Sequence, residues 1–383
     1  MSELRALARR DLQSAVPYDP GPSVAELEAR FGVKSLVKLN WNEDLFGLLP
    51  GVAEAVKGEL ARASLYPEHA YTDFRELVAA RSGASPAMVL PAHGIQALVF
   101  STVAAFVERG DKVVIPKATY GLYRQACSSA GAEIVRVPNA GYRIDLPAVI
   151  EATEGAKLVF VCDPNNPTGD ALSPDEWRQF LGALPKGCVA VADEAYADYM
   201  ASERRPDRVA DVTSGRPVVV LRTFSKLYGL AGLRLGYGLV HPDLVPCYDA
   251  VQEPFNLNRL SLAAGSACLA DPGAVEERRL EVQDAREHLV RSLGGIGIPS
   301  WPSEANFVLA EVGGDDGAFY EGLLRKGFLV RPGAGLGYPG HLRITVGPRP
   351  MMDALAEAIE AVTCELGRAS DYQGSSGKRQ ASR

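Results

Sequence analysis

Between residues 85 and 240 of this 383-residue chain, short apolar runs of strand length alternate with longer, helix-like segments. The strand-like runs lie at 88–90, 113–115, 133–137, 158–162, 189–192 and 218–221, and the helix-like segments include 119–130 and 174–184. Such alternation is typical of a parallel sheet whose strands are joined and covered by helices. The sequence therefore predicts an α/β fold built on a mostly parallel sheet.

Polar side chains follow three of these predicted strands. Asn166 comes after the run 158–162, Asp193 ends the run that begins at 189, and Lys226 follows the run 218–221. Ligands bind outside the carboxyl ends of the strands in an open parallel sheet, so we expect these groups to converge. A lysine that forms a Schiff base with a carbonyl cofactor needs a carboxylate for the ring nitrogen and an anion-binding shell for the phosphate. Taken alone, the lysine run is more often a solvated loop, but the combination favours pyridoxal phosphate (PLP) as the cofactor.

The remaining segments predict further units around this sheet. The run 235–240 follows the lysine too closely for a crossover helix, so we expect it to pair antiparallel. Helices are expected at 24–31, 261–270 and 275–293, and residues 296–366 predict a compact α+β unit with one of its strands at 328–331. The predicted divisions are an arm with part of a small domain at 1–40, a large PLP-binding domain at 41–272, a small C-terminal domain at 273–367 and a disordered tail at 368–383.

Composition excludes several other classes of protein. The net charge of −7 argues against nucleic acid as a partner, because a phosphate backbone requires a basic face. No run reaches the roughly 18 to 20 apolar residues that a membrane helix needs, and the first residues lack an apolar signal core, so we expect a cytoplasmic protein that binds no membrane. The six cysteines are scattered without close pairs, which favours buried thiols over disulfides or a metal site.

Four motifs, in this order, carry a resemblance to a known family. They are Asn166-Pro167-Thr168-Gly169, Asp193-Glu194-Ala195-Tyr196, the Lys226 loop with Arg234, and the segment 342–347. Together they resemble the aspartate-aminotransferase fold family, which comprises class I and II aminotransferases of PLP fold type I. The likeness is greatest to the histidinol-phosphate aminotransferases and spans residues 17–366. It implies a large domain with a mostly parallel sheet covered by helices, a small α+β domain and an N-terminal arm.

The resemblance implies roles for the residues around the cofactor ring. Lys226 would hold PLP as a Schiff base and later move a proton, which requires its pKa to fall from the usual value of about 10.4. Asp193 would face the pyridine nitrogen, and Tyr120 would stack on the ring. Asn166 and Tyr196 would bond the phenolic oxygen. The plainer interpretations are a helix cap for Asp193, a turn residue for Asn166 and a core aromatic for Tyr120.

A second group of residues would hold the cofactor phosphate. Gly94, Ile95 and Gln96 open a predicted helix whose backbone N–H groups and dipole favour an anion. The hydroxyls of Thr223 and Ser225, singly or together, and the guanidinium of Arg234 would complete the cradle. In the family a tyrosine of the partner subunit also reaches this phosphate. Tyr66 matches that tyrosine, which implies a homodimer with composite sites.

The substrate side of the site is expected to hold two arginines and an arm. Arg343 matches the family arginine that grips a carboxylate through a two-pronged contact, and Arg331 matches the position associated with a substrate phosphate. Tyr18, in the motif 17–21, matches an arm tyrosine that crosses to the partner's pocket.

Two segments depart from the subgroup pattern. One contains Trp41, which would narrow the substrate entrance, and Asn42 beside it. The other contains His93 and the residues Ile95-Gln96-Ala97, where the subgroup carries acidic residues.

These features leave more than one activity open. The leading hypothesis is an aminotransferase that moves an amino group between histidinol phosphate, or an amino acid, and 2-oxoglutarate or glutamate. The alternatives are a decarboxylase of a phosphorylated amino acid on the same fold, or an aminotransferase for an aromatic or specialised-metabolite amino acid. A sensing or structural module is disfavoured, because the lysine is present and no DNA-binding domain is fused.

Overall fold

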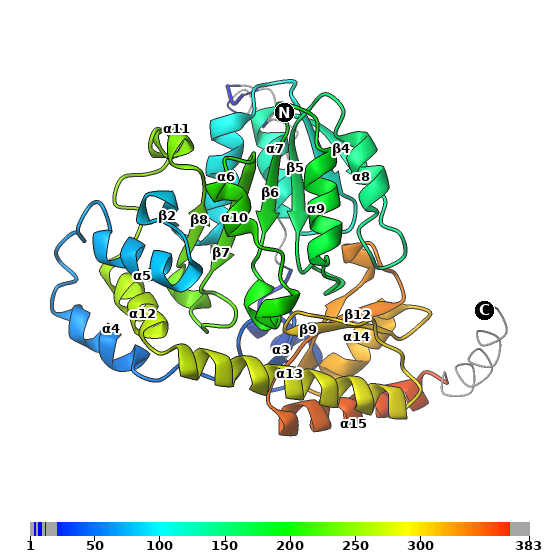
Figure 1. The fold of residues 1–383 in the computed structure, drawn as a ribbon. Coiled ribbons are helices and arrows are strands. Elements are labelled where there is room, and N and C mark those ends of the chain that lie inside the picture. Colours follow the sequence, from blue (N-terminus) through cyan, green and yellow to red (C-terminus); the bar gives the residue numbers. More distant parts are fainter. Residues whose placement is uncertain (1–3, 5–6, 10–11, 13–20, 368–383) are drawn as a thin grey trace.

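A computed structural model describes residues 21–367 of the chain and, ahead of them, residues 4, 7–9 and 12. Tyr18 and the predicted tail at 368–383 lie outside the described residues, so the expectations for them stay predictions. Figure 1 shows helices gathered around a central sheet, with a second, smaller group of strands and helices beside it.

The central sheet has seven strands in the spatial order β2-β8-β7-β6-β5-β3-β4. Their bounds are β2 Val89–Ala92, β3 Lys112–Pro116, β4 Glu133–Val137, β5 Ala156–Cys162, β6 Val189–Asp193, β7 Val218–Thr223 and β8 Gly236–Leu239. Strand β8 is antiparallel to both of its neighbours, and the other pairings are parallel. The mostly parallel sheet and the antiparallel strand after the lysine loop are therefore both confirmed.

Both faces of this sheet are buried, which explains the continuous apolar runs in its strands. Along β5, Leu158 and Phe160 point to one face, and Val159 and Val161 to the other. The first face packs against α6 Gly94–Phe106, α7 Leu122–Ala130 and α11 Val245–Asp249. The opposite face packs against α5 Thr72–Ser82, α8 Leu146–Ala152, α9 Pro174–Ala183, α10 Arg208–Thr213 and α12 Arg259–Ala270. Helix α4 Val52–Leu60 lies against α12.

Helix starts follow local sequence signals. At the start of α9, the Ser173 hydroxyl accepts a bond from the backbone of Glu176, whose carboxylate accepts one from the Ser173 backbone. Pro174 between them suits the first helical position. The same reciprocal box, from Ser23 and Glu26, opens α3 Val24–Phe31.

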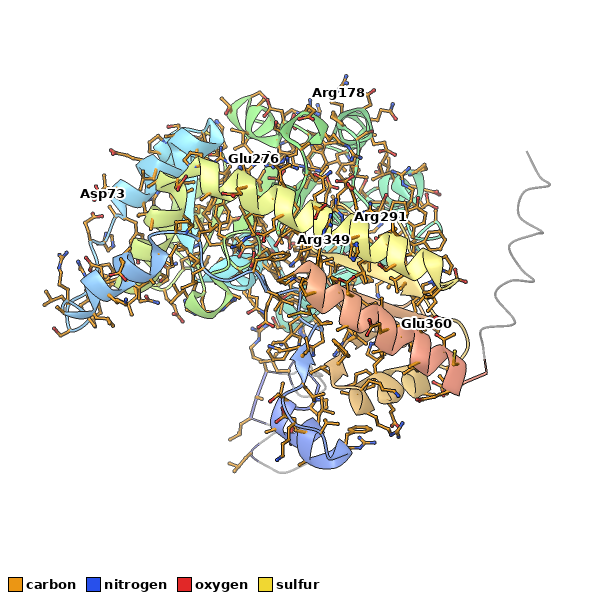
Figure 2. All side chains as sticks on the ribbon, turned by 90° about the horizontal axis from the view of Figure 1, so that it is seen from below. Asp73, Arg178, Glu276, Arg291, Arg349 and Glu360 are labelled. Carbon is orange, nitrogen blue, oxygen red and sulfur yellow. The ribbon has the colours of Figure 1, made fainter. Side chains whose placement is uncertain are left out.

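The C-terminal segment forms a second sheet with the order β11-β12-β9. The elements of this segment, in chain order, are β9 Phe307–Glu311, α14 Asp316–Arg325, β10 Phe328–Leu329, β11 Arg331–Pro332, β12 His341–Thr345 and α15 Arg349–Glu365. The long helix α13 Pro272–Gly295 leads into it, and α13 and α15 run side by side, with Arg349 of α15 bonding Asp284 of α13 (Figure 2). An α+β unit is confirmed here, while the domain bounds stay predictions.

The single strand predicted at 328–331 is wrong. β10 pairs in parallel with β1 Val37–Lys38, whereas β11 pairs antiparallel with β12. The chain changes partner at the buried Val330 between them. Apolar content alone cannot reveal such a change, because it does not record which strand a segment pairs with.

Among the described residues, no helix combines the length and apolar character needed to cross a membrane. Four of the six cysteines, Cys127, Cys162, Cys188 and Cys268, are buried in the core, as the apolar runs around them indicate.

Candidate active site

The site begins at the carboxyl ends of three adjacent parallel strands. Cys162 of β5, Asp193 of β6 and Leu221 of β7 lie in register with one another. Asn166 and Lys226 follow these strand ends by a few residues. The predicted convergence of polar groups at one edge of the sheet is therefore confirmed.

Lys226 lies against the backbone of the segment 40–42, at residues 41 and 42. Its Nζ donates to the backbone oxygens of Asn42, at 2.7 Å, and Trp41, at 3.1 Å, and lies 5.5 Å from the centre of the Tyr196 ring. Burial, and after it the nearby Arg343 guanidinium, lowers the pKa of Lys226 to about 7. A substantial fraction of this amine is therefore neutral near neutral pH, which a nucleophile or a proton-transfer base requires.

Asp193 is the buried acid of the site, with 2% of its surface exposed. Its Oδ1 accepts from the backbone N–H of Ala195 at 3.0 Å, and its Oδ2 accepts from the Tyr123 hydroxyl at 2.6 Å. Burial raises the pKa of Asp193 to about 6, and the two hydrogen bonds oppose that rise. The carboxylate can therefore be ionised at neutral pH while shielded from water.

Side-chain hydrogen bonds also connect the segment 40–42 to Asn166 and Tyr196, which follow the strand ends. Arg343 donates through Nη1 to Asn166 Oδ1 at 2.7 Å and through Nη2 to the backbone oxygen of Asn40. Asn42 donates through Nδ2 to the Tyr196 hydroxyl at 3.0 Å. Burial raises the pKa of Tyr196, so its hydroxyl keeps its proton and can donate a hydrogen bond.

Arg234 organises the anion-binding end. Its Nη1 donates to the Ser225 hydroxyl at 3.3 Å, and its Nη2 donates to Gln96 Oε1 at 3.2 Å. Gln96 Nε2 in turn donates to the Tyr120 hydroxyl at 3.0 Å. Within the part of the chain that the structure describes, the Thr223 hydroxyl bonds backbone groups only: it accepts from the Ser225 N–H and donates to the Leu235 carbonyl oxygen, so it shapes the turn that presents Ser225.

Gly94 leaves room for a phosphate beside that arginine. It opens α6 with φ +77°, and a Cβ added to it would lie 2.8 Å from Arg234 Nη2. A missing side chain, a helix N-terminus and a guanidinium together form a cradle that suits a phosphate group. With a buried carboxylate and a lysine of lowered pKa nearby, the residues present fit PLP.

Three further predicted residues are exposed in the structure. Trp41 is 46% exposed, with the Lys38 ammonium 3.5 Å from the centre of its ring. Tyr66 is 78% exposed and stacks on Phe255 at 4.6 Å. His93 precedes α6 and is exposed.

Arg331 and Arg343 occupy directly opposed positions on β11 and β12. Opposed residues of an antiparallel pair project from the same face of the sheet with Cβ atoms about 5 Å apart. Ile95, by contrast, is a buried core residue, so only its backbone is available at the start of α6.

Sequence reasoning missed two residues of the site. Tyr123 bonds Asp193, and Asn306 donates to the backbone oxygen of Asn42 at 3.2 Å. Tyr123 stands three residues after Tyr120 in the same motif, a spacing that offered a signal. Asn306 lies far along the chain, immediately before β9, and nothing in its neighbourhood marked it.

Comparisons with known proteins agree with this geometry. The family model described as aminotransferase class I and II matches residues 34–359. A histidinol-phosphate aminotransferase of Symbiobacterium thermophilum is 38% identical over 95% of this chain and 100% of its own length, and one from Anaeromyxobacter sp. is 39% identical over 88% and 93%. The crystal structure of a histidinol-phosphate aminotransferase from Sinorhizobium meliloti in complex with pyridoxal-5'-phosphate matches with a TM-score of 0.87, 30% identity, and coverage of 94% of this chain and 98% of that one.

The chain belongs to the class I and II aminotransferases. It is a PLP-dependent transferase of fold type I and is histidinol-phosphate aminotransferase-like over most of its length. The comparisons give no support to the decarboxylase alternative.

Proposed function

We propose that this aminotransferase moves the amino group of histidinol phosphate to 2-oxoglutarate. The observation that carries the proposal is the opposed pair Arg331 and Arg343, which places two cations on one face of the small sheet. A phosphate-bearing amine and a dicarboxylic oxo acid each carry anionic groups that such a pair can bind in turn. The named relatives support the same donor.

Each side chain around the cofactor has a proposed task. Lys226 would hold PLP through Nζ, and its neutral amine would carry a proton away from the substrate α-carbon; its lowered pKa supports both tasks. Bound PLP supplies an electron-withdrawing ring that makes loss of that proton possible. Asp193 keeps the ring nitrogen protonated, while Asn166 and Tyr196 donate to the phenolic oxygen.

The phosphate of PLP is proposed to lie between the start of α6 and Arg234. Backbone N–H groups of Gly94, Ile95 and Gln96 and the Ser225 hydroxyl donate to it, and Thr223 holds the turn. Tyr120 covers one face of the ring, steadied by its bond from Gln96.

A homodimer is proposed to complete the site. Tyr66 is largely exposed on its own subunit and stacks on Phe255, which is itself exposed. An exposed aromatic pair of this kind supports a subunit contact, through which Tyr66 would reach the partner's PLP phosphate. The arm tyrosine Tyr18 is proposed to cross to the partner in the same way. Gly21, at the end of its motif, lies beside Arg331, since a Cβ on Gly21 would be 3.5 Å from Arg331 Nη1.

A second candidate donor is an aromatic amino acid. Trp41 supports it, because its exposed indole belongs to the segment whose backbone receives the Lys226 amine. An exposed indole in this segment offers a flat apolar surface, which an aromatic side chain can contact. Asn42, next to it, contacts both Lys226 and Tyr196 and would position either donor.

The test compares two amino donors in the wild-type enzyme and in a variant that lacks the Arg331 side chain. Purified holoenzyme is supplied with 2-oxoglutarate and either histidinol phosphate or phenylalanine, and glutamate formation is measured. We expect the wild-type enzyme to prefer histidinol phosphate. Arg331→Ala should lower kcat/KM for it by roughly tenfold or more, and less for phenylalanine, because a hydrogen bond to a charged group is worth about 1.5–3 kcal/mol. Arg325→Ala, which removes an exposed arginine of α14, is the matched control and should leave kcat/KM unchanged for both donors.

Two results would contradict the proposed donor. One is a wild-type enzyme that transaminates phenylalanine but ignores histidinol phosphate. The other is an equal loss for both donors in Arg331→Ala. The assignment to the PLP aminotransferases does not depend on either outcome.

A further inference from the structure

Tyr123 lies in the first turn of α7 with none of its surface exposed. A buried hydroxyl requires a hydrogen-bond partner. This one donates to Asp193 Oδ2 at 2.6 Å. The bond joins α7 to the last residue of β6, the strand that presents the buried acid of the site.

We propose that Tyr123 is a positioning residue that fixes the orientation of the Asp193 carboxylate and thereby aligns the pyridine ring of the cofactor. This inference rests on the proposed role of Asp193. The Ala195 N–H bonds Oδ1 and the Tyr123 hydroxyl bonds Oδ2, so each carboxylate oxygen is held by a different element. Each oxygen accepts about two hydrogen bonds, and lone pairs therefore remain for a ring N–H.

The ring of Tyr123 is itself held from two sides. It stacks on Phe160 of β5, with centroids 4.7 Å apart and the planes 13° from parallel. It also contacts Tyr120 edge-on, at 5.5 Å and 88°. One side chain thus touches both the residue proposed to cover the face of the pyridine ring and the residue proposed to hold its nitrogen.

A neutral donor suits this position better than a cation. A lysine or arginine would neutralise Asp193 and compete with the protonated ring nitrogen for it. Burial, and the negative charge of Asp193, raise the pKa of Tyr123, so its hydroxyl stays protonated and always donates. Tyr123 therefore orients the carboxylate without removing its charge.

The test removes the hydroxyl and keeps the ring. Apoenzymes of the wild type and Tyr123→Phe are titrated with PLP and with an analogue in which carbon replaces the ring nitrogen, and the dissociation constants are measured by absorbance. We expect Tyr123→Phe to bind PLP roughly tenfold more weakly, because an Asp193 carboxylate that is no longer aligned makes a weaker charge-assisted hydrogen bond to the ring N–H. The analogue should bind equally to both proteins, since it presents nothing for Asp193 to hold.

Tyr248→Phe is the matched control. Tyr248 is fully buried in the same core cluster, and its hydroxyl bonds Thr102 at 2.9 Å rather than a residue of the site. It should leave both dissociation constants unchanged while losing stability comparable to that lost by Tyr123→Phe in thermal unfolding of the apoenzymes.

The outcomes separate the positioning role from the role on which it rests. Equal weakening of both ligands by Tyr123→Phe, or none, would overturn the positioning role and leave Tyr123 as core packing. A wild-type enzyme that binds the analogue as tightly as PLP would instead contradict the role of Asp193 itself, and the inference would fall with it.

Discussion

Replacement of Arg208 by alanine should destabilise the protein severely. The Arg208 side chain is 1% exposed and donates through Nη1 to Glu194 Oε1 at 2.8 Å and through Nη2 to Asp163. Its guanidinium also lies 4.1 Å from the centre of the Trp177 ring. These two carboxylates adjoin the strand ends that present Asn166 and Asp193, so Arg208 holds the loops of the site from behind.

The size of the stability loss depends on which buried charges lose their partner. Breaking a buried ion pair by removing one member costs about 3–5 kcal/mol, because an uncompensated charge stays buried. Glu194 retains Arg222, whose Nε lies 2.6 Å from Oε2. Among the hydrogen bonds of the described residues, the Asp163 carboxylate keeps only the one from the Leu172 N–H. We therefore expect a loss near the lower end, about 3 kcal/mol in the free energy of unfolding.

Urea unfolding of the holoenzyme at fixed PLP concentration measures this loss. Arg349→Ala is the control, because its pair with Asp284 is half exposed and screened by water, so its removal should cost far less stability. Burial already raises the pKa of Asp163, and loss of Arg208 must raise it further. The deficit of Arg208→Ala should therefore shrink as pH falls, because the folded state then takes up a proton at Asp163. A loss no larger than that of Arg349→Ala, or a deficit that grows in acid, would refute the reasoning.

Three further changes test other parts of the structure. The rate at which PLP reconstitutes the apoenzyme should rise with pH to about 7 and then level off, because the lowered pKa of Lys226 sets the supply of neutral amine; a rise that continues to pH 10 would contradict it. Gly169→Ala should lower the free energy of unfolding by about 2 kcal/mol or more, since its Cβ would lie 2.1 Å from Ser303 Oγ, whereas Gly187→Ala, also at positive φ but with open space, should cost only about 1 kcal/mol; equal losses would contradict this. Mixed subunits carrying Tyr66→Phe or Lys226→Ala should regain part of the activity through one intact composite site; continued inactivity, with mixed dimers shown to form, would count against the dimer.

The sequence predicted the central sheet well because burial on both faces leaves a strong signal. Apolar runs such as 158–162 are short, rich in Val and Phe, and interrupted by helix-like segments. The antiparallel direction of β8 was predictable too, since the loop before it is too short for a crossover. Polar residues at strand ends then marked Asn166, Asp193 and Lys226 together.

Other parts depend on pairings that no local pattern records. Helices α4 and α5 were not predicted, because both expose much of their surface and bury few side chains. The buried ions Asp163, Glu194 and Arg208 meet only in three dimensions. In the sequence each of them looks like an ordinary surface charge.

The same limit applies within the site. The hydroxyls of Thr223 and Ser225 were predicted to act singly or together at the phosphate. Only the backbone geometry reveals that the Thr223 hydroxyl bonds the turn that presents Ser225. Gln96 was predicted through its backbone, yet its side chain also links Arg234 to Tyr120. These details depend on the direction in which each side chain points, and residue type alone does not predict that direction.

The central claim is that Lys226 is the residue that holds PLP. The direct measurement is borohydride reduction of the holoenzyme, followed by proteolysis and mass-spectrometric mapping of the pyridoxyl group. We predict a single labelled peptide with the modification on Lys226, the lysine whose pKa burial lowers to about 7 beside the buried Asp193. Label on Lys34, Lys112 or Lys157 in place of Lys226 would contradict the account.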